Sequence, residues 1–298
     1  MLMSRSKCCS HKGKIAKNGI SKMKKYRHGA IFADKIKPFS DQIKHHISQG
    51  EVEKAFRLLE KKVKSNVVNK VDLITFAIQI RYTRYKPYLE RVYKLAKENK
   101  LSSIPLQGIL FNYLYKGGKH DVIEKMYEKL DIISKKDIGI TCIYLNTLRK
   151  LKEYDKAIKI INKIIKTNNI IENQIGLHEY FSLLVIKAYC LKDYENLNRE
   201  KIYLKESFKL FSYVLHNIDK KHEKYPWALC GIIFCISKDP SLGKDISLSN
   251  LKEELERQLP HLEKEGYRND NRTVIDINSA LEILDHLISR PYKNRTKS

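Results

Sequence analysis

The sequence predicts an all-α protein, an α-solenoid of about five helix-turn-helix repeats followed by a helical C-terminal cap. Three observations lead to this prediction. The 298 residues include 12 Gly and 7 Pro, too few for the frequent tight turns of a many-stranded sheet fold. Apolar residues recur at helical spacing along most of the chain. The same pattern also returns every 34 residues, a period typical of two-helix units.

The second helix of each expected unit shows the period most clearly. Its segments begin 34 residues apart, at Gly50, Arg84, Gly118 and Lys152. The equivalent apolar anchor positions are Ala55, Leu89, Ile123 and Ala157. Apolar residues follow each anchor at the third and fourth positions, which lie on the same face of a helix. We therefore expect every second helix to bury the same stripe.

The first helices repeat in the same register. Twelve residues before the anchors stand Ile43, Ala77, Phe111 and Leu145. A single hairpin cannot bury the stripes of both its helices, so neighbouring hairpins must stack. Gly50 and Gly118 follow two of the first helices, where a left-handed residue commonly ends a helix. The equivalent turns at Arg84 and Lys152 have a less favourable residue.

A fifth unit is displaced from the period. Its anchor, Leu197, lies 40 residues beyond Ala157, and the six extra residues fall in the polar segment 167–176. Beyond this unit the 34-residue period is no longer seen, although further amphipathic stretches follow. We therefore expect a basic leader over residues 1–33, helical repeats over 37–205, a C-terminal helical block over 206–289 and a basic tail over 290–298.

The 34-residue unit resembles the tetratricopeptide repeat, and NYLYKGGKHDVIEKMYEKL also resembles a pentatricopeptide unit with its Lys-x-Gly turn. The resemblance covers residues 37–205 and implies a binding scaffold of the helical-hairpin superfamily. The small residue of a tetratricopeptide first helix is replaced by Ile43, Phe111 and Leu145, and the closing proline is absent. The pentatricopeptide base-reading position would be occupied by Asp41, Thr75, Ile109 and Ile143. A code of one base per repeat is therefore not supported.

The charge of the chain points to an anionic partner. Lys and Arg number 58 against 34 Asp and Glu, a net charge of +24. Such a charge attracts polyanions: nucleic acid first, then an anionic membrane surface, then an acidic protein. AT-rich codon usage would also enrich Lys without selection for binding. No window approaches 18 consecutive apolar residues, so no membrane span is expected.

The leader has no acid before Asp34 and nine basic residues. It resembles a mitochondrial transit peptide, although Lys outnumbers Arg in it; a phosphate-gripping basic arm and a plain solvated tail are the alternatives. Cys8, Cys9 and His11 crowd into four residues and have no downstream partner pair of the kind that zinc sites use. The six cysteines form no disulfide framework, which indicates a reducing compartment.

The expected binding surface is the inner face formed by the first helices. On the first helices, residues that stand 34 positions apart form columns along this face. Three of these columns contain Arg, Lys, Tyr and Asn but no acid, and basic residues in the following turns extend them. Cations neutralise phosphates and Tyr stacks on unpaired bases. The candidate nucleic-acid-binding residues are Lys44, Arg81, Tyr82, Arg84, Asn112, Tyr115, Lys116, Asn146, Arg149 and Lys150. Ordinary solvated helix faces are the alternative.

The predicted function is therefore non-enzymatic binding of single-stranded RNA, in the mitochondrial matrix or else in the cytoplasm. Phosphate-binding loops and common hydrolase motifs are missing, so no catalytic residue, metal or cofactor is expected. The alternative is a protein-protein adaptor, part of a larger complex or a secreted bacterial factor. Asn112 and Asn146 match the Asn positions of a tetratricopeptide clamp for acidic peptides, but its basic positions are Gly139 and Ile143 here.

Overall fold

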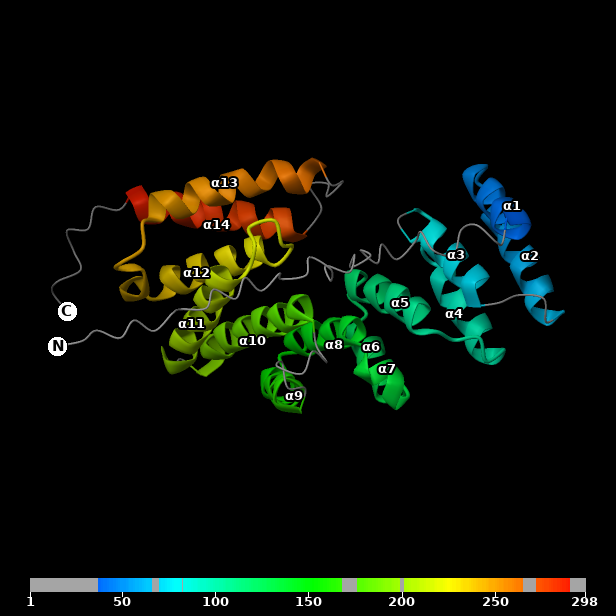
Figure 1. Ribbon diagram of the computed structural model, residues 1–298, viewed down its shortest axis with the longest axis horizontal. Helices are drawn as coiled ribbons and strands as arrows, with labels where there is room; N and C mark the ends of the chain where they lie inside the picture. Colours follow the sequence, from blue (N-terminus) through cyan, green and yellow to red (C-terminus); the bar gives the residue numbers. More distant parts are fainter. Residues whose placement is uncertain are drawn as a thin grey trace, which may run out of the picture. The chain divides into compact units, whose positions relative to one another are not determined.

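All the secondary structure that the computed structural model describes is helical (Figure 1). The described residues are 37–65, 70–81, 83–167, 176–198, 201–264 and 272–289. The expected leader, the basic tail and Tyr82 lie outside them. The all-α prediction is thus confirmed over the described part of the chain. By contacts the chain forms two compact units, residues 1–58 and 59–298.

The first unit is described from α1 (Lys37–Ser48) to the first half of α2 (Val52–Lys64). Ile43 and Ala55, the expected stripe positions of these helices, are fully buried. Gly50 adopts a left-handed φ of 80° in the turn between them. The backbone N–H of Glu51 donates to the carbonyl of His46 at 2.8 Å, a bond that ends the helix in the manner expected for a left-handed terminator.

Three helical hairpins occupy the first half of the second unit. They are α3 (Lys70–Ile80) with α4 (Tyr88–Glu98), α5 (Ile104–Lys116) with α6 (His120–Glu128), and α8 (Ile138–Lys150) with α9 (Tyr154–Thr167). The short helix α7 (Ile132–Lys136) precedes α8. Successive first helices pack together, α3 against α5 and α5 against α8. Each first helix therefore contacts its own partner helix and a neighbouring hairpin.

Burial of the repeated stripes follows the 34-residue register. Ala77, Phe111 and Leu145 on the first helices are fully buried. On the second helices, Leu89, Ile123 and Ala157 are at most 1% exposed. These apolar side chains leave water together, which is the main favourable contribution to helix packing. The predicted stripes are confirmed at these positions.

The turns after α5 and α8 have the same backbone geometry 34 residues apart. Gly118 and Lys152 adopt left-handed φ angles of 73° and 64°. The following N–H groups, of Lys119 and Glu153, donate 2.9 Å bonds back to carbonyls of the helices they leave. The turn at Arg84 differs: α3 ends at Ile80 and α4 begins at Tyr88, and this longer connection places no residue with positive φ among those described.

These two turns respond oppositely to substitution. Lys152→Gly is expected to raise the free energy of unfolding by about 1 kcal/mol, because a left-handed φ strains any residue with a Cβ. Gly118→Ala is expected to lower it by about 1 kcal/mol. A Cβ at Gly118 would meet no atom within 4 Å, so this loss reflects φ alone. Urea denaturation measures both effects.

Gly108 supplies the matched control, because it lies within α5 and a Cβ there also meets nothing within 4 Å. Gly108→Ala should stabilise the protein by about 1 kcal/mol, since Ala is the better helix former. Equal effects of Gly108→Ala and Gly118→Ala would contradict the proposed role of φ.

The C-terminal helices pack around one central apolar helix, α12 (Tyr225–Lys238). Against it lie α10 (Leu177–Asn198), α11 (Lys201–Asn217), α13 (Leu248–Lys264) and α14 (Arg272–Ser289), and the 3-10 helix η2 (Pro240–Gly243) follows it. One core cluster joins α10, α11 and α12 through Phe181, Phe211 and Ile232. The boundary expected between residues 205 and 206 therefore falls inside α11, within a continuous core. None of the described helices combines the length and apolarity needed to cross a bilayer.

Candidate nucleic-acid-binding surface

Arg149, a member of the predicted basic columns, lies in an ion pair close to the core. Its Nε donates to Oδ2 of Asp193 in α10 at 2.6 Å, and the two side chains are only 13% and 18% exposed. The guanidinium also lies over the ring of Tyr189, 4.5 Å from its centroid. Burial raises the pKa of Asp193, but the charges of Arg149 and Lys192 lower it by more, so the pKa is below its usual value. The Arg149 guanidinium is therefore held inside the protein, and we leave it out of the candidate surface.

Three other candidates are half-buried. Tyr115 packs against His120, with ring centroids 5.3 Å apart. The Asn146 amide donates to the carbonyl of Cys142 in its own helix at 3.0 Å. Lys150 is half-buried near the end of α8. Asn146 is therefore poorly placed for the peptide clamp that its position in the register suggested.

The remaining described candidates are exposed. Lys44 of the first unit lies 3.7 Å from Asp41, and Arg84 covers the Tyr85 ring and donates to its hydroxyl at 2.8 Å. The others, all in the second unit, are Arg81, Asn112 and Lys116. The nine described candidates thus have different environments, and the exposed Arg81, Asn112 and Lys116 remain candidates for contact with a phosphate backbone.

The positive charge is concentrated in the hairpin half of the sequence. Residues 1–175 contain 38 Lys and Arg against 16 Asp and Glu, whereas residues 176–298 contain 20 against 18. Almost all of the net charge of +24 therefore belongs to the leader and the hairpins. The composition of the whole chain does not show this asymmetry. Separate counts of charged residues in the two parts of the sequence do show it.

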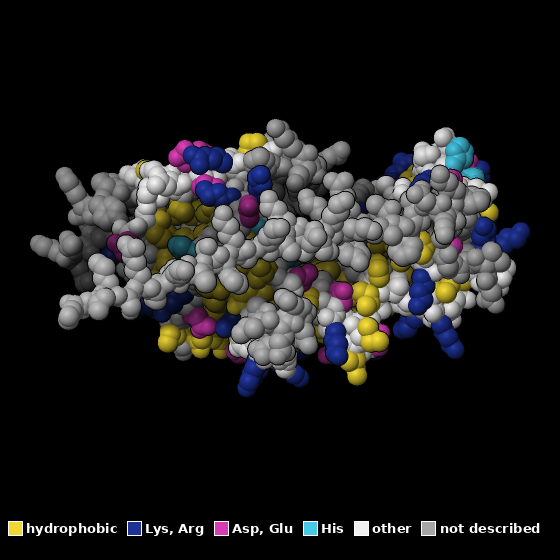
Figure 2. Space-filling model, in the orientation of Figure 1, with side chains coloured by type: hydrophobic (Ala, Val, Ile, Leu, Met, Phe, Trp, Pro, Cys, Tyr) yellow, Lys and Arg dark blue, Asp and Glu magenta, His cyan; other side chains and the backbone are white. Residues whose placement is uncertain are grey.

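A stripe of lysines runs along the outer face of α9. Lys159, Lys163 and Lys166 are exposed and lie on one helix face, at i, i+4 and i+7. Dark-blue side chains project around the position of α9 in Figure 2. None of the three forms an ion pair with another residue that the structure describes. We call this set the α9 lysine stripe; reading columns only from the first helices missed it.

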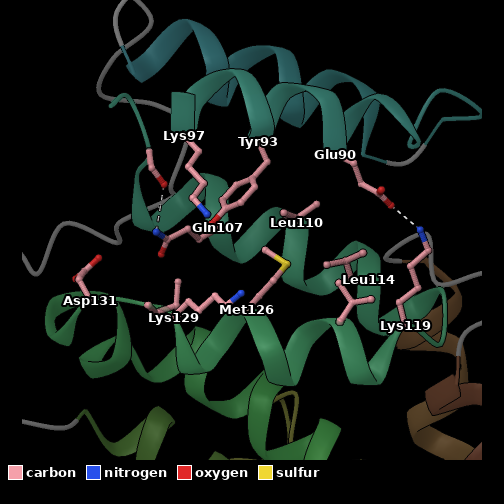
Figure 3. A pocket seen from close by; sticks show the side chains of 13 residues that line it. Glu90, Tyr93, Lys97, Gln107, Leu110, Leu114, Lys119, Met126, Lys129 and Asp131 are labelled. Atoms are coloured by element: carbon pink, nitrogen blue, oxygen red, sulfur yellow. Dashed lines mark hydrogen bonds and ion pairs between the residues drawn. The ribbon is translucent and has the colours of Figure 1, made fainter. Parts of the chain in front are cut away.

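A pocket of about 430 Å³ opens between α4, α5 and α6 (Figure 3). Its apolar walls include Leu110 and Leu114 of α5 and Met126 of α6. At one end Lys119 donates to Glu90 at 2.6 Å and so joins the α5–α6 turn to α4. The remaining polar lining residues are Tyr93, Lys97, Ser102, Gln107, Lys129 and Asp131.

Of the described cysteines, Cys190, Cys230 and Cys235 are buried and Cys142 is half-buried. Burial raises the pKa of Cys142 and of Cys190 to about 12, and that of Cys235 to about 11. The reactive species of cysteine is the thiolate, which these groups do not form near neutral pH. Within the described ranges, no group of three or more His, Cys, Asp and Glu is placed to hold a metal ion. Cys8, Cys9 and His11 lie outside those ranges.

Comparison with known proteins assigns no family to the chain: it matches no protein-family model and has no significant match among curated proteins. The candidate surface therefore rests on charge, exposure and geometry.

Proposed function

We propose that this chain is a non-enzymatic RNA-binding protein whose helical hairpins, similar to tetratricopeptide and pentatricopeptide repeats, bind single-stranded RNA. The observation that carries the proposal is the segregation of charge: residues 1–175 have 38 cationic against 16 anionic side chains, and the rest of the chain is almost balanced. A polyanion is attracted to the first part and gains little from the second.

The α9 lysine stripe supports this proposal. Successive phosphates of a single strand can each be neutralised by one of Lys159, Lys163 and Lys166, with release of the counterions that the phosphates held. Lys116, near the end of α5, and Arg81, just after α3, add exposed cations. The acid-free leader extends the proposal to the mitochondrial matrix as the place of action, with organellar RNA as the ligand.

Binding of the full chain to labelled single-stranded RNA, measured by fluorescence anisotropy across a salt series, tests the proposal. Changing the three lysines of the α9 stripe to Gln is expected to weaken binding at least tenfold at moderate salt. The slope of log affinity against log salt should fall by about 2, since each lost phosphate contact removes about 0.7. Circular dichroism melting checks that the variant remains folded.

The matched control changes three exposed lysines in the almost balanced half, Lys205, Lys209 and Lys221, to Gln. It removes the same charge but should change affinity by less than about threefold, because these side chains belong to the part of the chain in which cations and anions almost balance. Equal losses in the two variants would indicate diffuse attraction rather than a site. An affinity that does not change with salt would overturn RNA binding through phosphates.

A protein-protein adaptor is the second candidate, and exposed apolar side chains on α7 favour it. Ile132 and Ile133 are 74% and 72% exposed and adjacent. Such side chains cost little alone but contribute strongly when a partner covers them. Purification from the native cell with and without nuclease separates the two candidates: RNA-dependent partners are lost after nuclease, whereas direct protein partners are retained.

A further inference from the structure

The pocket between α4, α5 and α6 combines an apolar interior with a polar end. Tyr93 extends from α4 toward the pocket, and Met126 lies across it on α6 (Figure 3). A planar ring placed between them would contact an aromatic face and a polarisable sulfur, both of which favour aromatic ligands. The volume of about 430 Å³ is within the range of small-molecule sites.

One buried acceptor in the pocket lacks a partner. Gln107 is 5% exposed, and its Oε1 receives no hydrogen bond. Its Nε2 donates to the Ser102 hydroxyl at 3.3 Å, which holds the amide in place. Buried polar atoms are normally satisfied, so an orphaned acceptor on a residue that lines a cavity indicates a ligand that brings an N–H or O–H donor.

Two cations at the same end are also unpaired. Lys97 and Lys129 line the pocket from α4 and from the end of α6, and Figure 3 shows the Gln107 amide between them. Neither lysine forms an ion pair with any residue in the described ranges. The acids of the lining are already engaged: Glu90 with Lys119, and Asp131 with the N–H and hydroxyl of Ser134 at 2.8 Å each. The two lysines outnumber Asp131, the one carboxylate at this end, so an anionic group meets a net positive charge there.

We infer that this pocket binds one adenine nucleotide of a single-stranded RNA. The base lies between Tyr93 and Met126, its exocyclic amino group donates to Gln107 Oε1, and its phosphate contacts Lys97 and Lys129. A two-ring base fills the apolar interior better than a one-ring base. Gln side chains recognise the amino edge of adenine in other nucleic-acid complexes. The inference rests on the proposed function and names the base that the RNA presents.

An acidic peptide is the competing ligand. An apolar side chain with a nearby carboxylate would fill the interior and pair with Lys97 and Lys129, and a backbone N–H of the peptide could donate to Gln107 Oε1. The Tyr93 ring and the Met126 sulfur favour the nucleotide, because a planar base contacts both of them (Figure 3).

The test uses the full chain and two matched ligands, adenosine monophosphate and purine riboside monophosphate, which lacks the amino group. Calorimetric titration should show that the wild-type protein binds the first about tenfold more tightly. In Gln107→Leu, which keeps the size of the side chain but removes the acceptor, this preference should disappear. Oligoadenylate should also bind the wild-type protein more tightly than oligouridylate does.

A charge control separates the pocket from its surroundings. Lys97→Ser with Lys129→Ser should weaken oligoadenylate binding about tenfold, whereas Lys94→Ser with Lys125→Ser, on the same two helices but outside the lining, should change it less than threefold.

The outcomes distinguish the two proposals. RNA binding that is unchanged in the pocket variants would overturn the pocket inference and leave the proposed function standing. Mononucleotide binding that depends on Gln107, without RNA binding, would overturn the proposed function and leave a pocket for a free adenine nucleotide. Binding of neither ligand would overturn both proposals. An acidic peptide whose affinity falls in the Lys97 and Lys129 variant, but is unchanged in Gln107→Leu, would assign the pocket to a protein partner.

Discussion

Replacing Arg149 with Ala is expected to lower the free energy of unfolding by about 3 kcal/mol, the low end of the cost of breaking a buried ion pair. The substitution leaves the Asp193 carboxylate, 18% exposed, without the guanidinium that contacts it at 2.6 Å. Lys192, 2.9 Å from the same carboxylate, retains part of the compensation, which is why the higher end of the range is not expected. Urea denaturation at neutral pH measures the loss.

The pH dependence of this loss identifies its cause. In the wild-type protein the pKa of Asp193 is lowered, so its contribution to stability is present above the unfolded pKa and is lost as the pH falls through the folded pKa. In Arg149→Ala, burial acts with less opposition and raises that pKa. The difference between wild type and variant should therefore narrow on acidification, because a protonated Asp193 needs no cation. A difference that is independent of pH would point to lost packing instead.

The double variant Arg149→Met with Asp193→Leu completes the experiment. Replacing both partners with apolar side chains should recover most of the lost stability, since no buried charge remains unpaired. Its RNA affinity, measured well below the melting temperature, should equal that of the wild-type protein. A tenfold loss of affinity in this folded double variant would place Arg149 in the RNA-binding surface after all.

Replacing Gly231 with Ala is expected to cost about 3 kcal/mol, the upper end for overpacking a core. A Cβ on this residue of α12 would lie closer than 3.0 Å to three ring carbons of Phe211. Phe211 is fully buried in α11 and belongs to the cluster that joins α10, α11 and α12. Because the ring is fully buried, it can move aside only by displacing the side chains packed around it. Chemical denaturation gives the loss directly.

A double-mutant cycle shows whether the Phe211 ring is the obstacle. In a Phe211→Leu background, Gly231→Ala should cost at least 1 kcal/mol less than in the wild type, because the smaller side chain leaves room. Gly243→Ala is the matched control: its Cβ would lie 2.9 Å from Cγ2 of Ile236, a milder overlap than that with the Phe211 ring, so the loss should be smaller. Additive effects of the two substitutions in the cycle would contradict a direct contact.

The helices and their buried faces could be predicted because both depend on local spacing. Apolar residues at i, i+3 and i+4 specify which side of a helix is apolar. The 34-residue register then predicted that the equivalent positions Ala77, Phe111 and Leu145 lie on the buried faces of their helices. All three side chains are fully buried. Lys152 was likewise placed in a turn by its register with Gly118, and both have left-handed φ angles.

The candidate site was harder to predict because surface chemistry depends on partners far away in sequence. Arg149 belonged to columns without acids, yet its acid, Asp193, lies 44 residues later. Asp193 belongs to the displaced fifth unit and aligns there with Glu153, outside the three columns, so the columns could not reveal this pair. Gln107 gave no signal at all, since a lone Gln on an apolar helix face has many structural explanations.

The sequence by itself determined that the described chain is helical, which faces of its hairpins are buried and that nearly all of its net charge lies before residue 176. These properties follow from composition and short-range periodicity. Only the tertiary structure decided which cations are engaged within the protein and which are exposed, because ion pairs such as Arg149 with Asp193 join separate helices. It also created the pocket beside Gln107, since a cavity exists only where packed helices fail to fill the space between them.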